Sequence, residues 1–177
     1  MDLSALKRLD QRATRGLRRL LEPRPDAPAA AAAAAQGPQP VPAALRVTAI
    51  IARSADSLVL VPLFVALAWM EGFTRRGLAF PLGLAFVLSV LLTAVLKFSF
   101  RRRRPRGQWG RSYRRLDPHS FPSGHASRTA ALAVTAWVVQ GWPLGLALLV
   151  WSVLVSLARV VLGVHYTLDI LVGYLLG

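Results

Sequence analysis

A series of apolar runs begins at Ala43, each near the length of a membrane span, and it limits the folds that this chain can adopt. A helix rises about 1.5 Å per residue, so about 20 apolar residues cross the hydrocarbon core of a bilayer. The stretch from His165 to Gly177 is roughly one or two helical turns shorter, and we expect it to be an incomplete span. The runs cover residues 45–70, 78–100, 123–141, 143–162 and 165–177. The sequence therefore predicts an all-α fold, a polytopic bundle of transmembrane helices.

Composition favours the same class. Hydrophobic residues make up 54% of the 177 residues and the mean hydropathy is +0.45, which is too apolar for a water-soluble domain of this size. Cysteine is absent, which excludes disulfides, thiolate catalysis and cysteine-based metal sites. The net charge of +14 favours anionic lipid headgroups or a phosphorylated substrate as partners. Nucleic acid is not expected, because the basic residues stand at the ends of apolar runs, where a membrane surface explains them.

The chain begins with a basic segment that has helical periodicity. Leucines recur at helical spacing among Lys and Arg residues within residues 1–22, which we interpret as an amphipathic helix lying on anionic headgroups at the membrane interface. A solvated, partly disordered tail is the alternative. Residues 23–42 hold several prolines and an alanine run, and we interpret them as a low-complexity linker. Residues 43–177 then form the transmembrane domain.

Basic residues gather in two regions, the N-terminal segment up to Arg46 and the loop after the second span, from Arg101 to Arg115. Two predicted crossings separate these regions, so both should lie on one side of the membrane, and the charge bias makes that side cytoplasmic. A phosphate-binding site would be arginine-rich on either side, so the loop is not an independent indicator. Inside the first span, Arg53 and Asp56 are three residues apart, and we interpret them as a structural pair on one helix face.

Two cations at the end of the second span form the first motif. Lys97 lies near the end of the run 78–100, and Arg104 follows seven residues later, directly before the helix-stopping Pro105. A phosphate group would satisfy both cations. Taken alone, the stretch also fits a lysine that snorkels to the interface beside an arginine-rich flank.

The second motif, Pro122-Ser123-Gly124-His125, stands where a loop turns into the third span. Ser123 is a preferred N-cap residue, and Gly124 lets backbone amides approach a ligand. The first turn of a helix presents free N–H groups to an anion, and His125 in that turn can deliver a proton near neutral pH. A serine-capped membrane helix would explain Ser123 and Gly124 but not a histidine at the bilayer edge.

The third motif joins Arg159, at the end of the fourth span, to His165 and Asp169. A four-residue step places His165 and Asp169 on one helix face, so the carboxylate can hold the imidazole in one tautomer and support its charged form. A histidine held this way is a competent nucleophile. A metal pair and a structural hydrogen bond are the alternatives, and metal fits less well because no third ligand type is near in the sequence.

Together the three motifs resemble those of the type 2 phosphatidic acid phosphatase superfamily, integral-membrane lipid phosphatases, in order and in spacing. The resemblance implies metal-independent hydrolysis without a cofactor, in which His165 attacks phosphorus and forms a phosphohistidine. Asp169 would orient His165, and His125 would protonate the leaving oxygen. The groups implied to bind the phosphoryl oxygens are Lys97, Arg104, Arg159, Ser123 and Gly124.

One position departs from the family's pattern, because Ala158 stands where a serine usually precedes the arginine. The loss of one neutral hydrogen bond should cost on the order of 1 kcal/mol, which is too little to abolish catalysis. Within the family, the runs 102–105 and 121–128 look like those of small polyisoprenoid diphosphate phosphatases and of actinobacterial decaprenylphosphoryl-phosphoribose phosphatases.

The expected function is therefore hydrolysis of a polyprenyl (di)phosphate or a polyprenyl-phosphosugar at a bacterial plasma membrane, with the active site facing the cytoplasm. A phosphatidate or phosphatidylglycerophosphate phosphatase is one alternative. A catalytically silent scaffold of the same fold is another, and a basic membrane-surface adaptor is a third. The sequence does not determine the oligomeric state.

Overall fold

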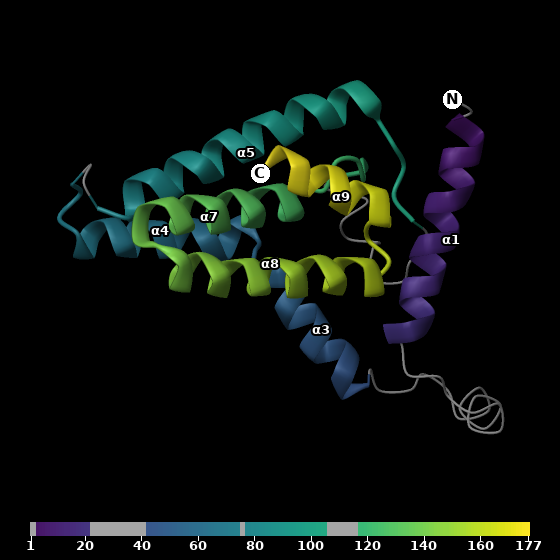
Figure 1. Ribbon diagram of the computed structural model, residues 1–177, viewed down its shortest axis with the longest axis horizontal. Helices are drawn as coiled ribbons and strands as arrows, with labels where there is room; N and C mark the ends of the chain where they lie inside the picture. Colours follow the sequence, from purple (N-terminus) through teal and green to yellow (C-terminus); the bar gives the residue numbers. More distant parts are fainter. Residues whose placement is uncertain (1–2, 22–41, 75–76, 106–116) are drawn as a thin grey trace.

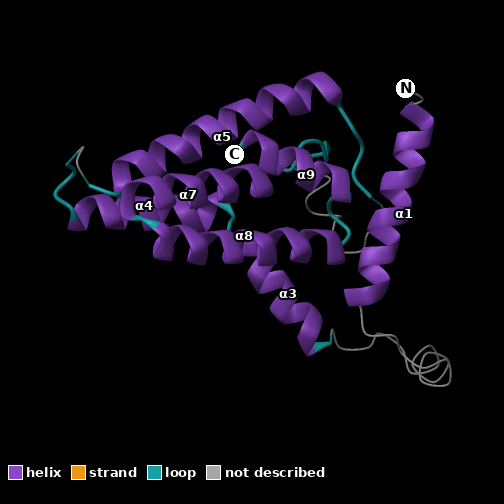
Figure 2. Ribbon diagram, in the orientation of Figure 1, coloured by secondary structure: helices purple, strands orange, loops and turns teal. Residues whose placement is uncertain are grey.

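The structure, a computed structural model, describes residues 3–21, 42–74, 77–105 and 117–177, and its elements in these ranges are helices (Figure 1). Apart from one isolated bridge between Arg103 and His119, these ranges hold no β-structure, which confirms the all-α prediction (Figure 2). The helices are α1 (Leu3–Leu21), α3 (Ala43–Arg53), α4 (Ser57–Met70), α5 (Ala79–Phe100), α7 (Gly124–Gln140), α8 (Trp142–Val161) and α9 (Thr167–Leu176).

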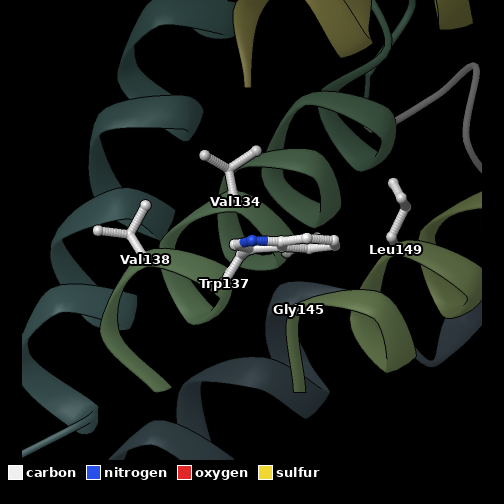
Figure 3. Close-up of a pocket in the computed structure, with 6 residues that line it drawn as sticks. Val134, Trp137, Val138, Gly145 and Leu149 are labelled. Atoms are coloured by element: carbon white, nitrogen blue, oxygen red, sulfur yellow. The ribbon is translucent and has the colours of Figure 1, made fainter. Parts of the chain in front are cut away.

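Helix α7 is the centre of the bundle. It runs antiparallel to α8, and α5 and α9 pack against it (Figure 1). The α7–α8 turn is made by Gly141, whose φ of +87° is a conformation that other residues rarely adopt. Gly145 allows the two helices to approach closely, since a Cβ at this position would lie 2.5 Å from the Cβ of Trp137. Figure 3 shows the Trp137 ring lying beside Gly145, with Val134, Val138 and Leu149 around it.

Two helices, α5 and α8, are long and apolar enough to cross a membrane, with 22 and 20 residues. Their bounds agree closely with the predicted runs 78–100 and 143–162. Helix α7 has 17 residues and α9 has 10, so within the described residues neither counts as a full span by itself. By length and composition the described residues therefore hold two candidate spans, or three if α3 and α4 together form one, against the four that were predicted.

The predicted run 45–70 is not one straight helix. It consists of α3 and α4, which are bent by 52° at residues 54–56, so the pair forms a broken span or a re-entrant loop. Irregular backbone at membrane depth needs partners from the protein. The carbonyl of Ala55 accepts from Arg128 Nη1 at 3.3 Å, and the Ser54 hydroxyl accepts from Trp151 Nε1 at 2.9 Å. The break also overturns the expectation that Arg53 and Asp56 share one helix face.

Helix α1 stands along the end of the bundle at which α5 ends, and it contacts α8 and α9 (Figure 1). The chain is helical from Leu3 to Leu21, as the leucine spacing predicts. The interfacial placement of this helix on lipid stays a prediction. The expected linker 23–42 lies outside the described residues except at its last position.

Candidate active site

Four helix ends meet beside α1. They are the C-terminal ends of α5 and α8 and the N-terminal ends of α7 and α9 (Figure 1). Because each of the three sequence motifs stands at one of these ends or in an adjoining loop, the fold brings the motifs together. Lys97 comes from α5, His125 from α7, Arg159 from α8 and His165 from the α8–α9 turn.

The predicted phosphate-binding cations share a carboxylate in the structure. Lys97 Nζ donates to Asp117 Oδ2, and Arg104 Nη2 donates to the same oxygen at 2.8 Å. Arg104 Nε also donates to the backbone carbonyl of Asp117 at 2.7 Å. Burial by itself would raise the pKa of Asp117, but the positive charges of Lys97 and Arg104 hold it below its ordinary value. An anion therefore already lies between the two cations.

The chain reaches this arrangement through an early helix stop. Helix α5 ends at Phe100, and Arg101 takes a left-handed conformation with φ +47°, so the helix stops before Pro105 rather than at it. The residues that follow are extended enough for Arg104 to turn back into the bundle, where it is 5% exposed.

His165 lies in the α8–α9 turn and is buried. Its Nδ1 lies 3.0 Å from the backbone carbonyl of Ser120, and its Nε2 lies 3.1 Å from Arg104 Nη1. A carbonyl oxygen only accepts, so Nδ1 carries the proton and Nε2 carries the lone pair. Burial and the nearby charges of Arg104 and Arg159 hold the pKa of His165 well below its ordinary value. The imidazole is thus neutral at pH 7, with its lone pair directed toward the cations.

Asp169 supports this turn in a way the four-residue spacing did not predict. His165 precedes α9, so the two residues do not share a helix face, and His165 Nδ1 lies 3.6 Å from Asp169 Oδ2, beyond a hydrogen bond. Oδ2 instead accepts from the backbone N–H of Tyr166 at 2.9 Å, as part of a capping box. The carbonyl of Ser120, and not the Asp169 carboxylate, therefore selects the tautomer of the imidazole.

The second motif forms the start of α7. Ser123 is the N-cap and its Oγ accepts from the N–H of Ala126 at 3.4 Å, which confirms the capping prediction, and His125 lies in the first turn. The N–H of Ser123 donates to the carbonyl of Asp169 at 2.9 Å, which ties this turn to α9. His125 Nε2 lies 2.7 Å from Asp56 Oδ1, so the break between α3 and α4 delivers a carboxylate to this histidine.

Arg159 is the remaining predicted cation, and at 1% exposed it is buried within the bundle. It lies close enough to both His125 and His165 for its positive charge to act on them. Gly124, at the start of α7, is buried beside Thr93 and Arg128. The part of the chain that the structure describes contains no cluster of His, Cys, Asp or Glu that could hold a metal ion.

Among the groups that contact the predicted residues, sequence reasoning missed the roles of Asp117, Asp56 and the carbonyl of Ser120. A signal existed for the two acids, because the chain has only 8 Asp and Glu against 22 Lys and Arg. An acid that stands in or beside an apolar run needs a reason, and here each one faces a motif residue. The carbonyl of Ser120 had no signal, because any residue type supplies one.

Fold and site together define an integral membrane protein whose site holds two buried histidines among cationic groups, with a carboxylate hydrogen-bonded to one of them. The chain belongs to the PAP2 superfamily, whose sequence profile matches residues 78–177. This confirms the resemblance drawn from the three motifs.

Individual relatives support the same family. The chain is 36% identical over 109 residues to the undecaprenyl-diphosphatase of Sulfolobus acidocaldarius, a match that covers 58% of this chain and 51% of the relative. It is 43% identical over 58 residues to the decaprenylphosphoryl-5-phosphoribose phosphatase of Mycobacterium tuberculosis, covering 33% of this chain and 31% of the relative. The matched part is thus about half of the first relative's length and less of the second's.

A solved structure matches nearly the whole chain. The PAP2 type phosphatidylglycerolphosphate phosphatase from Bacillus subtilis superposes with a TM-score of 0.72 at 25% identity. The match covers 98% of this chain and 81% of that protein, so it includes the helices that precede residue 78.

Proposed function

We propose that this chain hydrolyses the phosphate ester or diphosphate of a membrane lipid through a phosphohistidine on His165. The observation that carries the proposal is the setting of the imidazole. Its Nδ1 proton is held by the carbonyl of Ser120, and its Nε2 lone pair faces the Arg104 guanidinium, where a phosphoryl group would bind. A neutral, buried imidazole beside cations is suited to attack an anionic phosphorus centre.

In the first step, the Nε2 lone pair of His165 forms a bond to phosphorus and the bond to the leaving oxygen breaks. His125 gives that oxygen a proton, and Asp56 stabilises the imidazolium that carries it. Because Asp56 faces Nε2 of His125, Nδ1 is the nitrogen that serves the leaving oxygen. In the second step, water attacks phosphorus, His125 takes the proton from the water, and the phosphorus–nitrogen bond breaks to release phosphate.

The transferring group carries negative charge that the cations stabilise. Lys97, Arg104 and Arg159, with the Ser123 hydroxyl and the amide of Gly124, bind the phosphoryl oxygens in this proposal. For that to occur, the Asp117 carboxylate has to give up its contacts with Lys97 and Arg104. A catalytically silent scaffold would be expected to lack a nucleophile or an acid, and this chain keeps both.

The proposed substrate is a polyprenyl (di)phosphate or a polyprenyl-phosphosugar. Two relatives carry names of that class. Phosphatidylglycerophosphate is the second candidate, because the Bacillus subtilis structure with that name matches 98% of the chain. The proposal also places residues 1–22 on anionic headgroups, residues 43–177 as the catalytic domain, and the site on the cytoplasmic face of a bacterial plasma membrane.

A substrate panel tests the assignment. The purified full chain in detergent should release phosphate from undecaprenyl diphosphate or a polyprenyl-phosphosugar with a higher kcat/KM than from phosphatidate or phosphatidylglycerophosphate. The reverse order would replace the polyprenyl assignment with the second candidate. No release from any member of the panel would refute the phosphatase proposal.

The nucleophile has its own test. His165→Ala should abolish turnover while the protein stays folded, because no other group is placed to attack phosphorus in this proposal. A ³²P-labelled substrate, quenched in the steady state, should leave an acid-labile phosphohistidine on the native chain. Label on another residue, or substantial turnover by His165→Ala, would show that the nucleophile is elsewhere.

Metal independence is tested by chelation. Turnover in EDTA without added metal should equal turnover in untreated enzyme, because arginine and lysine supply the charge that a metal would otherwise supply. Loss of activity in EDTA that returns with Mg²⁺ would contradict the proposed mechanism.

A further inference from the structure

Helix α1 buries polar side chains in the middle of its contact with the bundle. Asp10 and Thr14 are 7% and 5% exposed, while Leu9 and Leu20 are 61% and 84% exposed. A buried polar group is costly unless it is hydrogen-bonded, so Asp10 and Thr14 require partners in the bundle. Leu17 continues the same face and packs near Val160 of α8. The face that meets the protein is thus the stripe of residues 10, 14 and 17, and not the leucines alone.

The polar stripe caps the helix that carries Asp169. The first N–H groups of a helix have no partner within the helix. At α9 they are satisfied from α1, because Thr167 N donates to Thr14 Oγ1 at 3.0 Å and Leu168 N donates to Asp10 Oδ1 at 2.8 Å. Helix α1 therefore determines how the first turn of α9 sits.

Asp10 also reaches the catalytic carboxylate through one arginine. The guanidinium of Arg102 donates through Nη2 to Asp10 Oδ2 at 2.5 Å and through Nη1 to Asp169 Oδ1 at 2.8 Å. Its Cζ atom lies over the ring of Tyr166, the residue next to His165, 4.2 Å from the ring centre. A planar guanidinium that bridges two carboxylates and stacks on a ring has little freedom to move.

We propose that α1 is a positioning element of the active site, in which Asp10, acting through Arg102, fixes Asp169 and the turn that carries His165. The inference rests on the proposed function, because it concerns the geometry of the proposed nucleophile. Asp10 and Arg102 are positioning residues and do not touch the substrate. The family profile begins at residue 78, so Asp10 lies outside the residues that it matches.

The chain offers a matched control at its other end. Glu71 caps α5, since its Oε1 and Oε2 accept from the N–H groups of Leu78 and Ala79 at 2.8 and 2.9 Å. Both Glu71 and Asp10 are therefore carboxylates that cap the first turn of a helix, and only Asp10 is linked to the site. A purely structural role predicts the same outcome for Asp10→Asn and Glu71→Gln.

The experiment compares these two variants in the full chain with undecaprenyl diphosphate in detergent micelles. We expect Asp10→Asn to lower kcat about tenfold with KM changed less than about twofold, because misplacement of a reacting group affects the chemical step. Glu71→Gln should keep the kcat of the unmodified chain, although it should lower the thermal stability by about as much as Asp10→Asn does. Arg102→Lys keeps the charge but cannot bridge both carboxylates, and should lower kcat by a similar factor.

A double variant makes the test sharper. Asp10→Asn combined with Arg102→Lys should have a kcat little lower than that of either single variant, because both substitutions break the same bridge. Asp10→Asn combined with Glu71→Gln should have the same kcat as Asp10→Asn alone. Equal kcat in Asp10→Asn, Glu71→Gln and the unmodified chain would overturn the inference, as would multiplicative effects of Asp10→Asn and Arg102→Lys. If Asp10→Asn does not fold, an unchanged kcat in Arg102→Lys overturns it. Absence of turnover by the unmodified chain would instead count against the proposed function.

Discussion

The two ends of the bundle use the same local chemistry with different consequences. At the end where α4 turns into α5, the Glu71 carboxylate accepts from two backbone N–H groups, and within the described residues its hydrogen bonds end there. At the end where α9 begins, Asp169 accepts from the backbone of Tyr166 and also from Arg102, which in turn binds Asp10. A helix cap becomes part of a site when its second oxygen is used to hold another charged group. It is thus the charged network, and not helix capping itself, that distinguishes the end of the bundle where the motifs meet.

The largest expected difference between the two ends is in their labelling from outside the cell, which should be all-or-none. Because the chain lacks cysteine, single cysteines can be labelled in intact cells with a membrane-impermeant maleimide against a blank background. Lys7→Cys and Arg101→Cys lie at the active-site end and Thr74→Cys at the other, and all three positions are exposed. We expect Thr74→Cys to be labelled in intact cells and the other two only after lysis, since the arginine-rich end should be cytoplasmic.

Other labelling patterns would change the comparison in defined ways. Labelling of Lys7→Cys and Arg101→Cys in intact cells, with Thr74→Cys protected, would reverse the orientation. Labelling of all three in the same compartment would mean that α5, with 22 residues, does not cross the membrane.

The next largest effect concerns Asp56, which lies at neither end but in the break between α3 and α4. Asp56→Asn should lower kcat about 10- to 100-fold, because the carboxylate no longer stabilises the protonated form of the proposed acid. The alkaline side of the pH–rate profile should move to lower pH, since an imidazolium without its carboxylate loses its proton more readily. An unchanged kcat and pH profile would make the 2.7 Å contact with His125 structural only.

The smallest expected effect belongs to Asp117. Asp117→Asn should strengthen competitive inhibition by orthovanadate about three- to tenfold, because a neutral amide competes less well than a carboxylate for Lys97 and Arg104. The measurement is the inhibition constant at fixed pH and ionic strength. Weaker inhibition in the variant would show that Asp117 arranges the two cations for the substrate rather than occupying their site.

Local rules account for the elements that were predicted well. The α5 and α8 bounds follow from runs of apolar residues, and the start of α7 follows from Ser123, a good N-cap directly before Gly124. These features depend on residues within a few positions of one another, so sequence spacing is enough to find them. The three motifs were found in the same way, and the fold brings them to one end of the bundle.

The elements that were predicted poorly depend on contacts across the fold. The break at residues 54–56 is held by Arg128 and Trp151, which are more than 70 residues away in the chain. His165 lies before α9 because Asp169 caps the start of that helix. Sequence spacing alone cannot distinguish this arrangement from one continuous helix that contains both residues. The helical prediction over 165–169 was therefore wrong in its start and correct in bringing the two side chains near each other.

Hydropathy and local spacing, which act over a few residues, were enough to identify a helical membrane protein and the three motifs of its family. That Asp56 meets His125, that Asp117 lies between Lys97 and Arg104, and that α1 reaches Asp169 through Arg102 became known from the fold alone. A carboxylate in an apolar bundle requires a partner, but its place in the sequence does not specify which one. The bond from Arg102 to Asp10 joins residues 92 positions apart, and it is the packing of α1 on α8 and α9 that makes them neighbours.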